Sequence, residues 1–352
     1  MIQRLLRGWW LYVFLGVLTL VLYLHAISLS SVKRVKSPLP APEVHASHRA
    51  EEWWPSPSDL TALQQTVKHE PWLGASLIVL GVLMLVMVLG GLGLTVRALL
   101  TRRIWTLWQG RTRQIPSWSF GELGRIVLLV ALVASLFPFI RMGVLCIRLD
   151  WALHSRAWVA VVMLLLNLFV VLTILTVASG KGRSISRVFG VSARTLWMSI
   201  RSGLHGYVAV FPWLLVLLVL VVSIARCVGV EPPPEPIQEL IFEEQSPSIL
   251  WLTVLLACVV GPLAEELFFR GVLYAALRRR TSRIWATLLS GGLFSLVHTN
   301  IVGFVPILLL GCVLADRYER TGSLMAPLTV HIAHNSLLMS LALIMRHAAH
   351  AS

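Results

Sequence analysis

GPLAEELFFRG, residues 261–271, places two adjacent carboxylates and one guanidinium inside an apolar run that extends from about Ile249 to Leu277. The run is long enough to cross a bilayer as a helix, which needs about 20 residues. A charged side chain at membrane depth costs at least roughly 2.5–3.5 kcal/mol, so it is usually paired, faces a cavity or serves a function. The three charges therefore either pair with one another to hold helices together or form a functional site.

Helix geometry gives the three charges different tasks. Glu266 and Arg270 are i,i+4 neighbours on one face and can neutralise each other, whereas Glu265 points elsewhere. Pro262 has no N–H, and its ring displaces the carbonyl four residues back, at Cys258. We therefore expect an ion pair between Glu266 and Arg270, a carboxylate free to act at Glu265, and a kink or a freed carbonyl beside it.

Composition predicts an all-α, polytopic membrane protein. The chain has 352 residues, of which 57% are hydrophobic and 13% charged. Several runs of about 20 apolar residues predict about 8–9 transmembrane helices, some of them shortened. The net charge of +14 comes from basic residues in short loops between these runs, where they orient the protein, and we do not expect nucleic acid as a partner. The four cysteines lie singly, without the spacing of metal ligands.

The chain divides into two regions. Residues 1–248 form an N-terminal transmembrane region with about five helices, at about 9–29, 72–99, 124–147, 157–178 and 204–227, with outer loops at 30–71 and 229–248. A short interfacial helix is expected near residues 189–200. Residues 249–346 form the second region. Basic loops alternate with mixed or acidic ones, which predicts a multi-pass protein of the cell membrane with a cytoplasmic N-terminus.

The apolar runs become shorter after Arg283. Those at about 284–298 and 302–315 have only about 15 residues, too few to cross a ~30 Å hydrocarbon core without tilt or shelter from neighbours. They are typical of packed elements within a helical bundle. Gly291-Gly292 would let another backbone approach closely. A longer run at about 323–345 ends the region.

These last helices carry the other unusual polar residues. Phe294 and His298 share one helix, and His331 and Asn335 are i,i+4 neighbours on another. At 1.5 Å per residue from the adjoining basic loops, Glu265 lies roughly 20 Å deep, His298 roughly 22 Å and His331 roughly 15–17 Å. Because three polar groups from three helices fall at similar depth, we expect them to share a cavity.

Such a cavity could run hydrolysis in two ways. A carboxylate shielded from bulk water can take a proton from a bound water, while imidazoles and an amide donate hydrogen bonds to a developing oxyanion. Alternatively, Glu265, His298 and His331 could hold one divalent metal ion, since catalytic zinc takes three protein ligands and keeps one position for water. Asn335 is a poor zinc ligand but a good oxyanion donor. The sequence has no HExxH motif.

The motifs EExxxR (Glu265, Glu266, Arg270), FxxxH (Phe294, His298) and HxxxN (His331, Asn335), in that order on successive helices, resemble those of the CPBP intramembrane protease family. This family is also called the Abi or CAAX-protease and bacteriocin-processing family, and it includes the type II CAAX prenyl endopeptidases. The resemblance covers residues 249–345. It implies a CPBP-like helical bundle and a peptidase in which Glu265 activates water, His298, His331 and Asn335 complete the site, and Glu266, Arg270 and Phe294 support it.

Three functions are compatible with these features. The first is an intramembrane endopeptidase that cleaves a membrane-associated or lipid-anchored peptide, which need not be prenylated. The second is a non-catalytic peptide-binding or bacteriocin-immunity protein, since the same family is associated with self-protection. The third is a proton-coupled transporter, because intramembrane Glu and His also serve as proton relays; no obvious inverted repeat supports it.

Overall fold

The structure is a computed structural model of the chain. It describes residues 67–101, 115, 118–146, 155–180, 182, 184–229, 240–298 and 302–351. The expected first helix at about 9–29, most of the loop at 30–71 and residues 230–239 lie outside the described residues. Every regular element within the described ranges is a helix, which confirms the all-α fold.

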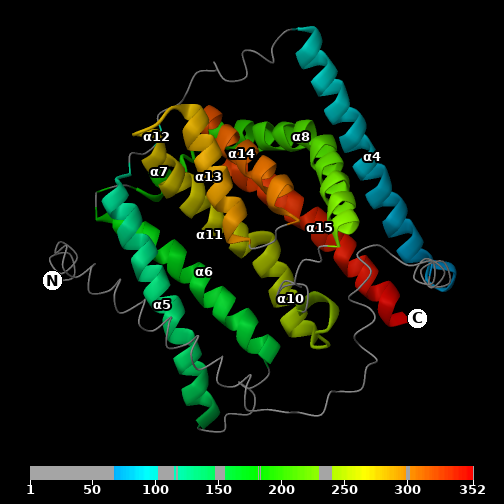
Figure 1. The fold of residues 1–352 in the computed structure, drawn as a ribbon, viewed down its shortest axis with the longest axis horizontal. Helices are drawn as coiled ribbons and strands as arrows, with labels where there is room; N and C mark the ends of the chain where they lie inside the picture. The colour runs from blue at the N-terminus through cyan, green and yellow to red at the C-terminus, as the bar shows by residue number, and fades with distance from the viewer. Residues whose placement is uncertain are drawn as a thin grey trace.

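Thirteen helical segments lie in the described residues, and the five from Pro247 to Arg278 follow one another without a break (Figure 1). They are α4 (Pro71–Leu100), α5 (Phe120–Cys146), α6 (Ser155–Ser179), α7 (Ile185–Phe189), α8 (Ala193–Val228), α10 (Pro247–Leu255), η3 (Leu256–Val260), α11 (Gly261–Glu266), η4 (Leu267–Tyr274), α12 (Ala275–Arg278), α13 (Arg283–Val297), α14 (Phe304–Thr321) and α15 (Met325–Ala351). The segments η3 and η4 are π-helical.

Six stretches of the described chain are long and apolar enough to cross a membrane, which confirms a polytopic membrane protein. They are Pro71–Leu100, Phe120–Arg141, Arg156–Ser179, Thr195–Val228, Pro247–Arg278 and Met325–Ala348. The continuous stretch from α10 to α12 carries the EExxxR motif, as the sequence predicted.

Contacts between distant segments define two ends of the bundle. At the acidic end, Arg156 at the start of α6 forms a salt bridge with Glu243, and His347 near the end of α15 contacts Glu70 just before α4. At the opposite, basic end, the Leu324 N–H bonds to the carbonyl of Phe189 at 2.9 Å, which docks α7 on the turn between α14 and α15. The last helix therefore runs from the basic end to the acidic end.

Helix α8 differs from the expected arrangement of a short interfacial helix followed by a separate span at about 204–227. The structure joins both parts into one helix of 36 residues. A straight helix of that length would measure about 54 Å, which exceeds a ~30 Å core. Pro212 lies inside α8, and Figure 1 shows the helix crossing the bundle before it turns along it. The bend at Pro212 lets one helix run first across the bundle and then along it.

Helices α13 and α14 form a hairpin that enters and leaves at the basic end. A Cβ on Gly311 would lie 2.9 Å from the Cα of Gly291, so the two backbones touch where both residues lack a side chain. Gly292 faces open space, so Gly291 alone provides the close approach that the glycine pair predicted. The two helices pack on each other along this face, while Trp285, Leu296 and Val297 on the outer face of α13 are 60–61% exposed.

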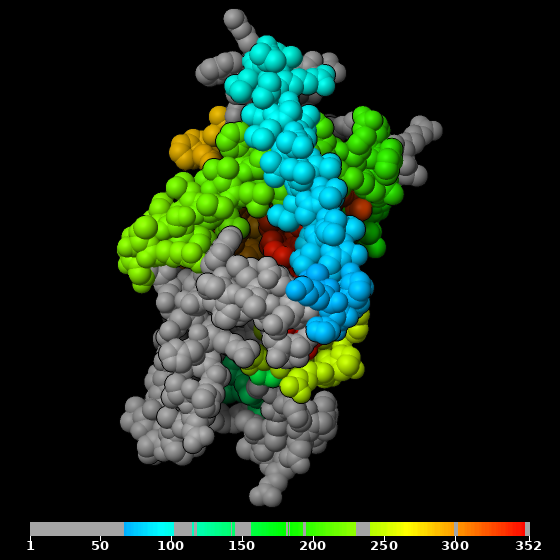
Figure 2. Space-filling view, turned by 90° about the vertical axis from the view of Figure 1, so that its right-hand side faces the viewer, coloured from blue at the N-terminus to red at the C-terminus, as the bar shows by residue number. Residues whose placement is uncertain are grey.

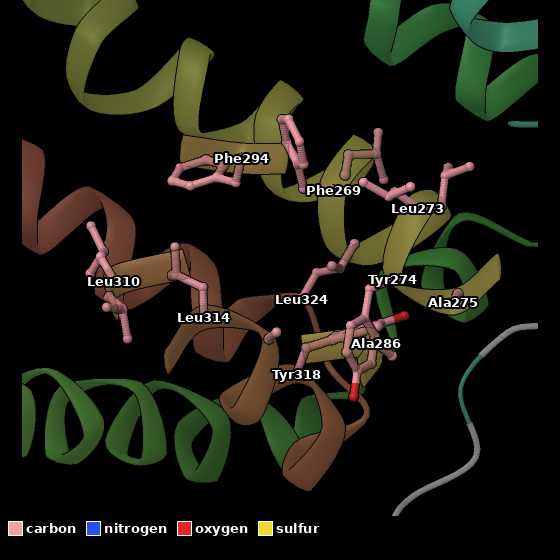
Figure 3. Close-up of a cluster of buried hydrophobic side chains, with 14 of the residues drawn as sticks. Phe269, Leu273, Tyr274, Ala275, Ala286, Phe294, Leu310, Leu314, Tyr318 and Leu324 are labelled. Atoms are coloured by element: carbon pink, nitrogen blue, oxygen red, sulfur yellow. The ribbon is translucent and has the colours of Figure 1, made fainter. Parts of the chain in front are cut away.

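The hydrophobic core beneath the site joins η4, α13 and α14. Phe269, Tyr274, Phe294, Leu314 and Tyr318 are among its buried side chains, and they come from these three elements (Figure 3). Phe269 and Phe294 meet edge to face with ring centroids 5.1 Å apart. This core holds the helix that carries the two glutamates against the α13–α14 hairpin.

Candidate active site

The proline of the first motif changes the hydrogen-bond register just before the glutamates. The Gly261 N–H bonds to the Leu256 carbonyl, five residues back, which is the π-helical register. In that register the Ala257 carbonyl would pair with residue 262, but Pro262 has no N–H. A carbonyl is therefore freed as expected, one residue earlier than the α-helical register predicts. π-Helical turns of this kind are frequent at functional sites.

Three buried charged or polar side chains form a chain across two helices. Arg270 donates from Nη1 to Glu266 Oε1 at 2.9 Å, and His331 Nδ1 lies 2.8 Å from the same oxygen. Their side chains are 0%, 1% and 3% exposed for Arg270, Glu266 and His331. The expected ion pair is thus confirmed. Because a carboxylate accepts, the His331 Nδ1–H donates to Glu266, which leaves Nε2 to face the other way.

Glu265 stands at the free side of this histidine. Its Oε2 lies 3.7 Å from His331 Nε2, too far for a direct hydrogen bond. The Glu265 side chain is 34% exposed, yet Oε2 itself is buried and has no hydrogen-bond partner among the described residues. A buried oxygen without a partner is a place where a bound water is expected, and a water beside both atoms could bond to each.

The phenyl ring of Phe294 is the common contact of the other site residues. The Arg270 guanidinium carbon lies 4.4 Å from its centroid, and the rings of His298 and His331 lie 4.7 and 5.6 Å from it. His298 donates from Nδ1 to the Phe294 carbonyl at 2.7 Å, which fixes the imidazole at the end of α13. The FxxxH motif thus places its histidine on the same ring as His331, and no direct contact joins His298 to Glu265.

Asn335 is tied to the π-helical turn rather than to Glu265. Its Nδ2 donates to the Ala257 carbonyl at 2.8 Å, which is the carbonyl that Pro262 leaves without a donor. One amide hydrogen of Asn335 is thereby used, and the second remains for another acceptor. The HxxxN motif therefore connects α15 to the glutamate-bearing helix at two levels, through His331 and through Asn335.

The candidate ligands do not fit a metal site in this arrangement. Among the described residues, which include Glu265, His298 and His331, no three His, Cys, Asp or Glu side chains are placed so that they could hold a metal ion together. The Nδ1 atoms of both histidines are already engaged, with Glu266 and with the Phe294 carbonyl. We therefore derive no step through a metal.

Sequence reasoning missed several partners of the site. Tyr207 of α8 contacts His334 Nδ1 through its hydroxyl at 3.2 Å, one turn from His331. The Gly311 carbonyl accepts from Arg270 Nη2 at 3.1 Å. His334 could have been suspected from its i,i+3 spacing to His331. Nothing in the sequence connects Tyr207 or Gly311 to the motifs, because both contacts arise only from tertiary packing.

Comparison with known proteins agrees with the motifs. Residues 247–337 match the family described as type II CAAX prenyl endopeptidase Rce1-like. The C-terminal region of the chain is therefore Rce1-like. This confirms the resemblance drawn from the three motifs, all of which lie inside the matched range. No solved structure matches the chain significantly.

Two curated relatives match parts of the chain. One is the "Putative membrane peptidase YdiL" of Bacillus subtilis (strain 168), 28% identical over 88 residues, which cover 25% of this chain and 36% of the relative. The other is the "Uncharacterized 24.3 kDa protein" of Escherichia coli, 28% identical over 110 residues, which cover 30% of this chain and 51% of the relative. The matches thus span about a third to a half of these relatives.

Proposed function

We propose that this chain is an intramembrane endopeptidase in which Glu265 activates a water molecule to hydrolyse a membrane-associated or lipid-anchored peptide. The observation that supports it most is the buried Oε2 of Glu265, which has no hydrogen-bond partner in the described ranges and lies 3.7 Å from an imidazole nitrogen that Glu266 orients. The Rce1-like match and the relative named as a membrane peptidase point to the same class of reaction.

The proposed reaction assigns each proton to a named group. A water between Glu265 Oε2 and His331 Nε2 attacks the peptide carbonyl carbon while the Glu265 carboxylate takes its proton. The carboxyl group then delivers this proton to the leaving amine nitrogen, which restores the carboxylate. Glu266 keeps His331 in one tautomer, and Arg270 holds the Glu266 carboxylate in place through the buried ion pair.

The oxyanion would be stabilised by donors from α13 and α15. Asn335 has one amide hydrogen left after its bond to Ala257. His298 can donate from Nε2 only as an imidazolium, because its Nδ1–H already bonds to the Phe294 carbonyl. An oxyanion donor is typically worth about 10²–10³ in kcat. Asn335→Ala should therefore lower kcat less than the loss of the Glu265 carboxylate does.

The decisive experiment removes the base without changing the shape of the site. The purified chain in lipid vesicles is assayed with a quenched fluorescent peptide that carries a farnesylated cysteine, and with the same peptide lacking the lipid. We expect Glu265→Gln to lower kcat by at least about 10²–10⁴, the usual contribution of a general base. Glu265→Asp should retain measurable activity because it keeps a carboxylate.

The matched control is Glu243→Gln, which removes one carboxylate from the exposed acidic end. It should leave cleavage unchanged. If Glu265→Gln cleaved either peptide as fast as the parent protein, while Glu243→Gln did the same, Glu265 would not be the base. Comparing the two peptides decides in the same assay whether the lipid is part of the substrate.

A further inference from the structure

Four basic side chains gather near the basic end of the bundle, where α4, α8 and α14 meet. This basic cluster consists of Arg97, Arg201, His205 and Arg317. Arg201 and His205 are i,i+4 neighbours on α8, and Arg317 of α14 lies against the adjacent Gly206. Arg97 lies in the last turn of α4, which packs on α8 at Gly91. Arg97, Arg201 and His205 are exposed, and the side chain of Arg317 is 17% exposed. Three helices thus bring like charges together rather than separating them.

Gly206 of α8 leaves room for the Arg317 side chain to reach this cluster. A Cβ on Gly206 would lie 2.7 Å from Cδ and 3.1 Å from Nε of Arg317, so the arginine crosses α8 where the helix has no side chain. Its Nη2 pairs with Asp316 Oδ2 at 2.5 Å, but its Nε is buried and has no partner in the described part of the chain. The arginine is therefore held in place with a donor unused.

The carboxylates nearby do not balance the charge. Asp316 is shared by Arg317, Arg283 and Arg320. No carboxylate of the described chain pairs with Arg97 or Arg201. Like charges placed together without counter-charges cost free energy, so their arrangement calls for an anionic ligand.

The surroundings of the cluster indicate that the anion belongs to a lipid. Val96, Leu100, Trp197 and Leu204 lie on the same turns as the basic residues, and their side chains are 52%, 80%, 69% and 45% exposed. Apolar side chains this exposed are expected to face acyl chains, and a tryptophan is typical of the membrane interface. Figure 2 shows α4 lying across the face formed by α8, the pair of helices that carries these residues.

We propose that the basic cluster binds the phosphate of an anionic phospholipid, whose acyl chains lie along the exposed apolar side chains of α4 and α8. Basic pockets between transmembrane helices bind anionic headgroups in this way. The lipid joins α4 and α8 to α14, which belongs to the Rce1-like region, so it stabilises the contact between the N-terminal helices and the candidate catalytic helices. The inference does not depend on peptidase activity.

The test measures lipid binding to the full-length protein in a neutral detergent. Dioleoylphosphatidylglycerol and dioleoylphosphatidylcholine are titrated separately, and bound lipid is counted by native mass spectrometry. The parent should prefer the anionic lipid. The double variant Arg97→Gln/Arg201→Gln should bind phosphatidylglycerol roughly 25-fold more weakly, because each basic side chain near an anionic headgroup contributes about fivefold. Its phosphatidylcholine binding should not change.

The matched control is Arg187→Gln/Arg280→Gln, which removes two exposed arginines from the basic end outside the cluster. It should change phosphatidylglycerol binding by less than about twofold. Equal losses in both double variants, or no loss in either, would overturn the proposal.

Two further probes identify the source of the anion. Inorganic phosphate, and a soluble peptide with a free C-terminal carboxylate, are each tested for thermal stabilisation of the parent protein. The proposal expects neither to match phosphatidylglycerol at equal concentration. If either did so, and lost its effect in Arg97→Gln/Arg201→Gln, the cluster would be a site for a soluble anion or a substrate carboxylate, and the lipid assignment would be wrong.

Discussion

Arg270 shows how the cost of a buried charge is offset in this bundle. Its guanidinium is fully buried, yet it bonds to Glu266, bonds to the Gly311 carbonyl and stacks on Phe294. These contacts come from three helices, so the arginine also joins the two-glutamate helix to the α13–α14 hairpin. The contribution of this ion pair to stability can be measured by replacing Arg270 alone and then Arg270 and Glu266 together.

Removing only the arginine should be worse than removing both charges. Arg270→Met leaves the buried Glu266 carboxylate without a counter-charge, with His331 as its remaining hydrogen-bond partner. It should lower the free energy of unfolding by about 3–5 kcal/mol. Arg270→Met/Glu266→Gln should recover part of that loss, because no buried charge remains without a partner. Reversible unfolding in mixed micelles measures both. If the double variant lost as much free energy of unfolding as Arg270→Met and Glu266→Gln lose in sum, the two residues would act independently.

At the scale of the element, Gly311 and Gly291 let α13 and α14 touch. A side chain at Gly311 would meet the Gly291 backbone at 2.9 Å, and Gly311 also supplies the carbonyl that Arg270 binds. Gly311→Ala should therefore lower the free energy of unfolding by roughly 1–3 kcal/mol, as overpacking does, and reduce peptide cleavage. Gly292→Ala is the matched control, because nothing lies within 4 Å of its Cβ position.

The control should be neutral or slightly stabilising, since alanine favours a helix over glycine by roughly 0.5–1 kcal/mol. Unfolding in mixed micelles and cleavage of the fluorescent peptide check both variants. Equal destabilisation by the two alanines would mean that the hairpin tolerates a wider separation than the structure has.

The sequence predicted those parts of the site that depend on local spacing. The Glu266–Arg270 pair follows from i,i+4 geometry, and the separation of Glu265 from that pair follows from the same periodicity. The partner of Asn335 could not be predicted, because the Ala257 carbonyl is freed only by a π-helical register that propensities do not reveal. The sequence also did not predict the length of α8. It predicted two helices, whereas the structure has one helix that bends at Pro212.

At the scale of the whole molecule, the N-terminal region reaches the Rce1-like region through several contacts. Helix α7 docks on the turn between α14 and α15, where the Leu324 N–H bonds to the Phe189 carbonyl. Tyr207 of α8 contacts His334 beside the candidate catalytic histidine. Because the matched range begins at residue 247, these contacts join α15, and the turn that precedes α15, to helices outside that range. The helices before it therefore help to hold α15 in position.

Gly190 tests this coupling. It has a positive φ of 61°, and a Cβ there would lie 2.0 Å from the Gly322 carbonyl oxygen. Gly190→Ala must therefore separate α7 from the α14–α15 turn. Gly182 is a matched control, because it has a φ of 68° with nothing within 4 Å of its Cβ position.

Both alanines carry the cost of a left-handed conformation, roughly 1–2 kcal/mol, so the difference between them isolates the docking contact. We expect Gly190→Ala to lower the thermal unfolding midpoint several degrees more than Gly182→Ala, and to reduce peptide cleavage because His331 lies on α15. Equal unfolding midpoints and equal cleavage rates would mean that the Rce1-like region holds its catalytic helix without help from α7.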